Sequence, residues 1–160
     1  MCSSDLTALK TKSVDAIWIF YAWAGVKTEL EGLETDYFAF ADLDSVFDFY
    51  TPVIIANNTF LAEEPETARA FLDAVSRGYE FAIEHPQEAG EILCKAAPEL
   101  DPDLVKASQE YLADKYQADA PQWGYIDQER WDAYYAWLNE KGLTETPIEA
   151  GTGCSNEYLP

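Results

Sequence analysis

Aromatic side chains near the end of the segment Val14–Trp23 are the residues of this chain best suited to contact a ligand. Phe20, Tyr21 and Trp23 offer flat rings that could stack on a heterocycle. Glu29, about one helical turn downstream, could accept hydrogen bonds from an amine of such a ring. Small-ligand sites combine aromatic walls with a few polar groups, so this grouping predicts a binding site. Core packing of the aromatic residues and a solvated position for Glu29 are the alternatives.

Tyr50 and Thr51 begin a second apolar segment and are the next ligand candidates. The sequence YTPVIIANN, residues 50–58, is rich in β-branched residues and ends at an Asn-Asn turn signal. Pro52 near its start is compatible with a strand that has just entered a sheet. If this strand crosses between two lobes, its entry end lies nearest the cleft. We therefore expect Tyr50 and Thr51 to contact the ligand there.

No pattern of residues predicts catalysis or a bound metal ion. The 30 acidic residues generate carboxylate pairs by chance, and the glycine-rich, nucleophile-elbow and HExxH motifs are absent. His85, the only histidine, lies at an expected helix start, where a capping or surface role is the ordinary one. Cys2, Cys94 and Cys154 are far apart and form no CxxC pair, so neither a zinc site nor a disulfide framework is indicated. We predict no catalytic residue, no cofactor and no metal.

The composition is that of an acidic, globular chain. With 30 acidic and 10 basic residues, the formal net charge of the 160 residues is −20. Nucleic acids and anionic membrane surfaces bind basic patches, so neither is an expected partner. Hydrophobic residues make up 48% of the chain, which is typical of a folded domain. No run reaches the ~18 apolar residues of a membrane span, so no direct membrane insertion is expected, and no signal peptide is recognised.

The hydrophobic pattern predicts an α/β fold with strands at Val14–Trp23 and Tyr50–Asn58 and a weaker strand at Tyr37–Phe40. Both faces of the first strand are apolar, as in a parallel sheet that is covered on both sides. Two strong strands and a weak one cannot make such a sheet, so we expect this chain to be part of a larger α/β protein. Helices are expected from Val26 to Leu33 and after starts at Pro65, Pro86, Pro102 and Asp127, the last ending at Gly142.

Two long stretches resemble a known family. VDAIWIFYAWAGVKTELEGL, residues 14–33, and YTPVIIANNTFLAEEPETARAFLDAVSRGYEFAIEHPQEAGEIL, residues 50–93, are similar to the extracytoplasmic substrate-binding proteins of ABC importers. The similarity is to the branch that binds thiamine pyrimidine precursors and includes riboflavin-type binders. YQADAPQWG and SNEYLP resemble the last helical region and the C-terminus of that group. The resemblance therefore covers about residues 9–160.

The resemblance implies a type II periplasmic-binding-protein fold, of which this chain carries the C-terminal half only. Residues 9–49 would be the remainder of lobe 2, residues 50–143 the return to lobe 1, and residues 144–160 a C-terminal tail. Residues 1–8 do not resemble the family. The family's N-terminal half, with its Asp-Trp-x-Pro-Asn segment and its ligand contacts, has no counterpart here. The expected fold is thus incomplete: the end of lobe 2 plus the C-terminal part of lobe 1.

The function implied by the resemblance is solute binding without catalysis, in the periplasm or lipid-anchored at the cell surface. The ligand would be a small aromatic heterocycle such as a thiamine pyrimidine precursor, and the partners would be the permease and ATPase subunits of an ABC importer. The same superfamily contains enzymes that make the thiamine pyrimidine from their own histidine and a pyridoxal cofactor, but their cysteine-rich iron-binding motif is absent here. Such an enzyme and a stand-alone acidic interaction module are the alternatives.

Overall fold

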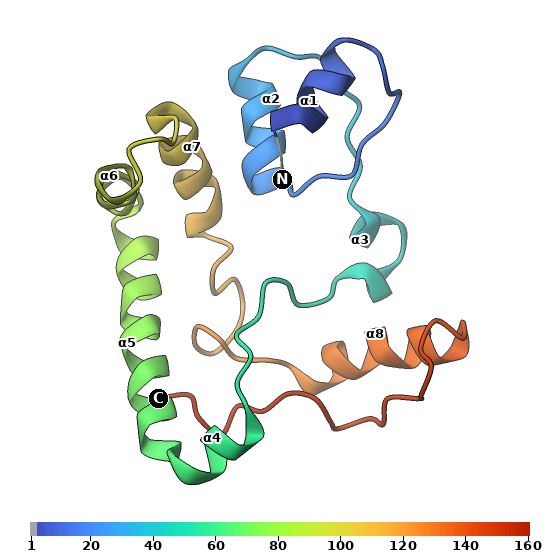
Figure 1. Ribbon diagram of the computed structural model, residues 1–160, viewed down its shortest axis with the longest axis vertical. Helices are drawn as coiled ribbons and strands as arrows, with labels where there is room; N and C mark the ends of the chain where they lie inside the picture. Colours follow the sequence, from blue (N-terminus) through green and yellow to red (C-terminus); the bar gives the residue numbers. More distant parts are fainter. Residues whose placement is uncertain (1–2) are drawn as a thin grey trace. The chain divides into compact units, whose positions relative to one another are not determined.

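The computed structural model describes residues 3–160, which form helices joined by irregular segments (Figure 1). These residues divide into two compact units. The first comprises the residues up to Asp36 together with Gly78–Ala118, and the second comprises Tyr37–Arg77 together with Asp119–Pro160. Helix α5 (Pro65–Glu84) contains the boundary between them. The chain leaves each unit and returns to it, so segments far apart in sequence build both.

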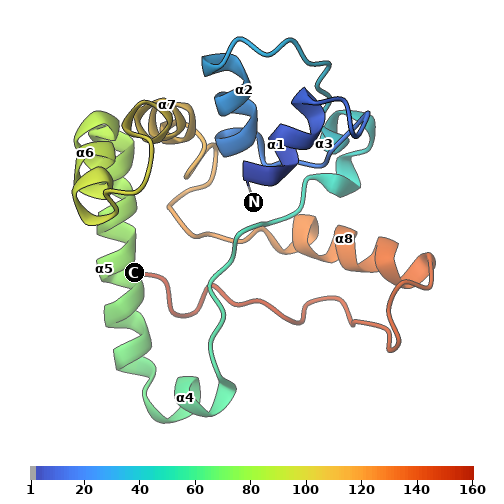
Figure 2. The ribbon, with the colours of Figure 1, turned by 45° about the horizontal axis from the view of Figure 1, so that its top comes forward.

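In the first unit, helices α6 (Pro86–Ala96) and α7 (Pro102–Ala113) lie side by side (Figure 2). Gly90 of α6 faces α7, because a Cβ atom added there would lie 3.6 Å from the Cα atom of Lys106. Val105 of α7 is 1% exposed and is the most deeply buried large side chain among the described residues. The α6–α7 contact therefore supplies the centre of this unit's core.

Three short elements complete the first unit: α1 (Ser3–Lys10), the π-helical turn η1 (Tyr21–Gly25) and α2 (Val26–Leu30). Thr28 of α2 is buried, but its hydroxyl donates a hydrogen bond to the carbonyl of Gly25 at 2.6 Å. This bond satisfies the one buried polar side chain of α2 and ties the helix to the turn before it. The buried apolar side chains of these elements are Leu6, Ala24 and Val26.

The second unit is organised around α8 (Gln128–Glu140). The segment that contains α3 (Phe40–Leu43) and the 3₁₀ turn η2 (Ser45–Phe47) contacts α8 through aromatic rings. The ring of Phe47 meets that of Trp137 edge to face, with centroids 5.2 Å apart. Aromatic contacts of this kind, rather than a large aliphatic core, therefore hold this segment to α8. The unit also contains α4 (Asn58–Glu63), the first part of α5, and an irregular tail, residues 144–160.

The helix starts predicted from sequence are confirmed, whereas the helix expected from Val26 to Leu33 ends at Leu30. Asp101 caps α7 by accepting hydrogen bonds from the N–H groups of Asp103 and Leu104, at 3.0 and 3.5 Å. Asp127 caps α8 by accepting one from the N–H of Arg130 at 2.8 Å. Helices also begin at the expected Val26, Pro65 and Pro86, and Gly32 and Gly142 follow α2 and α8 with φ angles of +62° and +65°.

The three predicted strands are wrong, and the α/β architecture is not confirmed, because no residue from 3 to 160 is in a strand. The Val14–Trp23 segment is irregular until it enters η1, Tyr37–Phe40 runs into α3, and Tyr50–Asn58 runs into α4. A strand is held by a hydrogen-bonded ladder to a neighbouring strand, and none of these segments has one within the described residues. These segments do contain apolar side chains, but some of them are exposed to solvent, as for Ile55, which is 88% exposed.

Candidate functional site

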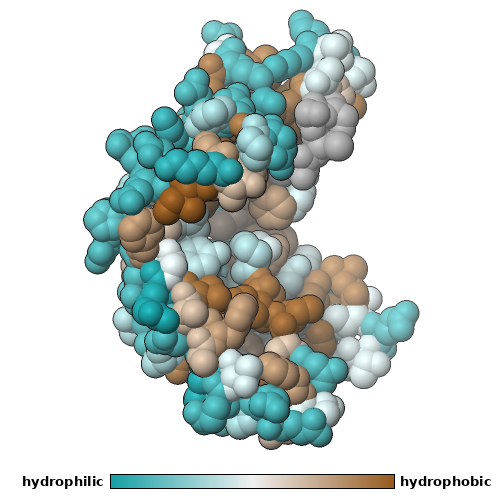
Figure 3. All heavy atoms as spheres, turned by 60° about the vertical axis from the view of Figure 1, so that its left-hand side comes forward, coloured by the Kyte–Doolittle hydropathy of each residue, from teal (hydrophilic) through white to brown (hydrophobic). Residues whose placement is uncertain are grey.

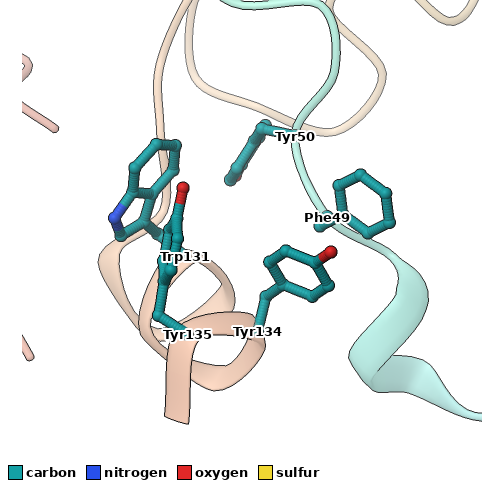
Figure 4. Close-up of a pocket in the computed structure, with 5 residues that line it drawn as sticks. All are labelled: Phe49, Tyr50, Trp131, Tyr134 and Tyr135. Carbon is teal, nitrogen blue, oxygen red and sulfur yellow. The ribbon is translucent and has the colours of Figure 1, made fainter. Parts of the chain in front are cut away.

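Five aromatic rings line a cavity of about 40 Å³ in the second unit (Figure 4). Trp131, Tyr134 and Tyr135 come from α8, where spacings of three and four residues place side chains on one helix face. Phe49 and Tyr50 come from the irregular segment after η2. The pocket is therefore built by a helix and a segment that lie far apart in sequence.

Contacts between the rings fix their relative orientation. Phe49 stacks on Tyr134, with ring centroids 4.4 Å apart and an interplanar angle of 21°. Tyr135 contacts both Trp131, at 5.0 Å and 48°, and Tyr134, at 5.7 Å and 68°. Such aromatic pairs contribute about 0.5–1.5 kcal/mol each beyond the burial of their surface. The walls of the pocket are therefore formed before any ligand arrives.

Hydrogen bonds tie the polar ends of two of these rings to the backbone. The hydroxyl oxygen of Tyr50 accepts a hydrogen bond from the backbone N–H of Asp127 at 2.9 Å. The indole Nε1–H of Trp131 donates to the carbonyl of Thr152 at 3.0 Å. By contrast, the hydroxyl of Tyr135 has no hydrogen-bond partner within residues 3–160. This hydroxyl can therefore serve as donor or acceptor for a bound molecule.

Arg130 contacts Tyr50, one of the five rings of the pocket. Its guanidinium carbon lies 4.3 Å from the centroid of the Tyr50 ring, in a cation–π contact. The same guanidinium donates hydrogen bonds to the carbonyl and to the carboxylate of Asp48, both at 2.5 Å. Arg130 is therefore charge-paired, and it links the start of α8 to the residues that precede the pocket.

Four of the ligand candidates predicted from sequence lie in the first unit, where the structure brings two of them together. The hydroxyl of Tyr21 donates a hydrogen bond to the carboxylate of Glu29. The Tyr21 ring also contacts that of Tyr111, with centroids 5.2 Å apart. Phe20 is 46% exposed, and Trp23 is half-buried within η1. Tyr21 and Glu29 thus form a polar pair, while Phe20 offers an open ring beside it in the chain.

The π-helical turn η1 determines where Tyr21 points. Turns of this type are rare and occur frequently at functional sites. Gly25 ends the turn, and a Cβ atom there would lie 2.7 Å from Cγ of Tyr21, so any other residue would force the Tyr21 ring to shift. The apolar pattern of the sequence does not predict this turn. The one sequence signal for so close an approach is a glycine four residues after Tyr21, at the end of an aromatic-rich segment.

The two remaining candidates lie in the second unit and have different surroundings. Tyr50 lines the pocket, whereas Thr51 is exposed and precedes a cis peptide bond to Pro52. Sequence reasoning missed the other four rings of the pocket. Three of them recur at spacings of three and four residues along α8, a pattern that is equally typical of a helix face packed in a core. The missed residues are Phe49, Trp131, Tyr134 and Tyr135.

Two shifted pKa values give no sign of an activated nucleophile. Burial raises the pKa of the Cys154 thiol, and the nearby Asp132 carboxylate adds to this, against a hydrogen bond to Gln128. Burial likewise raises the pKa of the Tyr116 hydroxyl. A thiol with a raised pKa stays protonated near neutral pH and is a poor nucleophile. Both groups are therefore better suited to packing than to covalent chemistry.

The surroundings of His85 show no converging catalytic groups. An open hollow of about 450 Å³ lies at the turn from α5 to α6, and its lining consists of the consecutive residues Glu84–Glu88. The His85 side chain is 52% exposed, with the Glu84 carboxylate 3.9 Å away. No group of three or more His, Cys, Asp or Glu side chains in the described part of the chain could hold a metal ion. Among residues 3–160, no helix has both the length and the apolar character needed to cross a membrane.

Both segments that supply the predicted contacts, residues 14–33 and 50–58, fall inside a match to a known protein family. The family described as NMT1/THI5 like matches residues 1–89, which is more than half of the chain. The chain belongs to the NMT1/THI5-like family. This family has a periplasmic-binding-protein-like fold. The resemblance recognised in the sequence to substrate-binding proteins of this kind is therefore confirmed.

Three curated relatives of this NMT1/THI5-like chain indicate the range of its similarity. It is 29% identical over 124 residues to the formylaminopyrimidine-binding protein of Halalkalibacterium halodurans, a match that covers 75% of the chain and 37% of the relative. It is 24% identical over 140 residues to the riboflavin-binding protein RibY of Chloroflexus aurantiacus, a match that covers 81% of the chain and 38% of the relative. It is 36% identical over 116 residues to the 4-amino-5-hydroxymethyl-2-methylpyrimidine phosphate synthase of Candida albicans, covering 69% and 31%.

The chain thus spans less than two fifths of the length of each of these relatives. Two of the three are named as binding proteins for a pyrimidine or a flavin, and the third as a synthase of a pyrimidine phosphate. Substrate binding, pyrimidines, thiamine and riboflavin were the terms expected from the sequence, and these names agree with them.

Proposed function

We propose that this chain acts in solute binding, and that it holds a small aromatic heterocycle of the pyrimidine class for uptake by an ABC importer without changing it chemically. The observation that carries the proposal is the pocket of five rings around Tyr50. It occurs in a chain whose relatives include proteins named for binding formylaminopyrimidine and riboflavin. Aromatic walls with a few polar groups are the usual composition of small-molecule sites.

The volume of the pocket favours a single ring over a larger ring system. Sites that enclose drug-sized ligands have volumes of roughly 300–1,000 Å³, whereas this cavity has about 40 Å³. The pocket would therefore take the edge of one ring, which could stack on an aromatic wall and hydrogen-bond to the Tyr135 hydroxyl. A three-ring flavin would extend far outside it.

In the first unit, Tyr21 and Glu29 form a second proposed set of ligand contacts. A carboxylate has about four lone-pair positions, so Glu29 can accept the Tyr21 hydrogen bond and still accept one from a ring amine. The exposed ring of Phe20 would cover the apolar part of the ligand. Each set of contacts can be tested separately by substitution.

The wider assignment rests on family membership. We propose the type II binding-protein fold, with residues 9–49 as the remainder of lobe 2 and residues 50–143 as the return to lobe 1. An extracytoplasmic location and an ABC permease and ATPase as partners belong to the same proposal. Support for it comes from the NMT1/THI5-like match and from the two relatives named as binding proteins.

Calorimetric titration with 4-aminopyrimidine and with riboflavin tests the function directly. We expect the pyrimidine to bind more tightly, and we expect Tyr50→Leu to weaken its binding by about tenfold or more, because one stacked ring contributes about 1–3 kcal/mol. Tyr125→Leu is the matched control, since Tyr125 lies in the same unit and does not line the pocket. Equal affinities of the Tyr50→Leu variant and the unchanged protein, or no binding of either compound by folded protein, would contradict the proposal.

A second candidate function is an enzyme of pyrimidine phosphate synthesis. The observation that favours it is the 36% identity to the Candida albicans synthase. Its test is mass-spectrometric detection of a pyrimidine phosphate product, compared between the unchanged protein and a His85→Asn variant. Product that disappears in the variant supports the enzyme, and absence of product from folded protein removes it. The open, local surroundings of His85 favour the binding function.

A further inference from the structure

The five-ring pocket has features that specify the charge of the group it takes. We propose that it binds a small organic cation, namely a quaternary ammonium or a protonated amine group, through the faces of its rings. This inference deepens the proposed function and rests on it, because it assigns a charge class to the ligand of the same site. Four observations support it: the angles between the rings, the contact of Arg130 with Tyr50, the acidic residues of α8 and the volume of the cavity.

The rings enclose the cavity at several angles instead of forming one stack. Phe49 and Tyr134 are nearly parallel, whereas Tyr135 is turned 68° from Tyr134 and 48° from Trp131 (Figure 4). Each aromatic face carries partial negative charge, so a cation within about 6 Å of several faces is attracted by all of them. A flat neutral ring, by contrast, stacks only on walls that lie parallel to it, and Tyr135 is parallel to neither Trp131 nor Tyr134. The arrangement is therefore better matched to a compact cation.

One ring of the pocket already binds a cation in the structure. The guanidinium of Arg130 lies over the Tyr50 ring at 4.3 Å. Since the Asp48 carboxylate pairs with that guanidinium at 2.5 Å, the Arg130 charge is balanced where it stands. Arg130 therefore demonstrates the cation–π interaction on Tyr50 without leaving a net positive charge that would repel a second cation.

The start of α8, the helix that carries three of the lining residues, is rich in acidic residues. Besides Arg130, which is paired with Asp48, it has Glu129 in its first turn, Asp127 as its cap and Asp132 further along. The five lining residues include no lysine or arginine. The whole chain has a formal net charge of −20, which raises the local concentration of cations and speeds their encounter. The electrostatic field therefore favours a cation over an anion.

The volume of the cavity excludes large cations. A cavity needs about 10–15 Å³ on this measure to hold one water molecule, so about 40 Å³ accommodates a group of only a few heavy atoms. A methylated ammonium group or the amine-bearing edge of a protonated ring is of this kind. A larger molecule would place only such a group in the pocket.

A comparison of two molecules of the same shape isolates the effect of charge. Choline and 3,3-dimethyl-1-butanol differ at one atom, which is a charged nitrogen in the first and a neutral carbon in the second. Their binding can be followed by NMR through the indole N–H resonance of Trp131, which lies on the pocket wall. We expect choline to bind about tenfold more tightly, the difference produced by a partly desolvated cation–π interaction.

Variants locate that binding in the pocket. We expect Tyr135→Leu to weaken choline binding about fivefold or more, because it removes one aromatic wall, while Tyr125→Leu leaves it unchanged. Equal affinities of the unchanged protein for the two compounds, or a Trp131 resonance that neither compound shifts, overturn the inference, and neither result depends on whether a variant folds. If 4-aminopyrimidine binds but choline has no advantage over its neutral counterpart, the inference fails and the proposed function stands. If choline binds and no heterocycle does, the proposed function fails instead.

Discussion

The ring of Tyr21 packs directly on the backbone of Gly25, so closely that a Cβ atom there would lie 2.7 Å from Cγ and 2.8 Å from Cε2 of the tyrosine. Gly25 has an ordinary right-handed helical conformation, with φ −64° and ψ −50°. Glycine is therefore required at this position for space and not for backbone freedom. The close approach directs the Tyr21 hydroxyl to Glu29, so the geometry of the polar pair depends on a residue that carries no side chain.

Gly25→Ala is expected to destabilise the protein by about 1–3 kcal/mol, because the added methyl group must displace a packed aromatic ring. The displacement should also break the Tyr21–Glu29 hydrogen bond. Urea unfolding measures the first effect, and loss of the effect of Glu29→Gln in the Gly25→Ala background measures the second. Full additivity of the two substitutions would show that Gly25 does not position Tyr21.

Gly78→Ala is the matched control for that substitution. Gly78 lies inside helix α5, and a Cβ atom there would meet nothing within 4 Å. Alanine is the better helix former by roughly 0.5–1 kcal/mol, so this variant should be more stable than the unchanged protein. Opposite signs for the two glycine-to-alanine changes, measured in the same urea titrations, would separate the steric requirement at Gly25 from a general effect of alanine.

The cap of α8 supports the aromatic pocket, and its removal should be measurable. Asp127 accepts the N–H of Arg130 at 2.8 Å through its side chain, and its own N–H donates to Tyr50 at 2.9 Å. Asp127→Ala should lower the free energy of unfolding by about 1 kcal/mol. Asp127→Asn should lower it much less, because asparagine is an equally good cap. Equal losses in both variants would mean that the charge, and not the cap, is responsible.

The helix starts could be predicted because their signals are local. Asp101 followed by proline, and Asp127 four residues before Trp131, are complete within one turn of chain. The pocket could not be predicted, because Tyr50 meets α8 only through the folded structure. The rings of α8 do recur at helical spacing, but periodicity does not distinguish rings that fill a core from rings that line a cavity.

The strand predictions failed because a strand depends on a partner that its own sequence does not specify. Residues 53–57 have the β-branched composition of a strand, yet they lie exposed and have no partner strand within the described part of the chain. The apolar pattern therefore indicates that these residues favour burial. It does not show which strand, if any, would form hydrogen bonds with them. Figure 3 shows hydrophobic residues gathered on the surface among hydrophilic ones. Leu43 and Leu143 are 68% and 63% exposed, so uncovered apolar surface is not confined to this segment.

Exposure predicts opposite outcomes for two aliphatic residues. Ile55 is 88% exposed and Leu104 is 3% exposed. Ile55→Lys should change the free energy of unfolding by no more than about 0.5 kcal/mol and should reduce aggregation, whereas Leu104→Ala should cost about 2–5 kcal/mol. Urea unfolding and light scattering measure these effects. A loss of more than about 1 kcal/mol on Ile55→Lys would mean that the segment is covered in solution.

The pKa of Tyr116 predicts how stability depends on alkaline pH. Burial of the hydroxyl is the main cause of its raised pKa, and the nearby Tyr79 adds to it, while the hydrogen bond with Gln109 at 3.1 Å opposes it. Because the folded protein then holds this proton more tightly than the unfolded chain, stability is fully present below the unfolded tyrosine pKa of about 10. It is lost as the pH rises from that value through the higher folded pKa.

The Tyr116→Phe variant isolates this contribution, because phenylalanine keeps the ring and has no proton to lose. Urea unfolding of both proteins between about pH 8 and pH 11 should show a steeper fall in the free energy of unfolding for the unchanged protein as the Tyr116 hydroxyl ionises. Tyrosines that do not interact with Tyr116 contribute equally to both curves and cancel in the difference. Parallel curves across this range would mean that the Tyr116 hydroxyl is solvated in the folded protein. The packing of Tyr79 against Tyr116, at 4.9 Å, would then be looser than the structure describes.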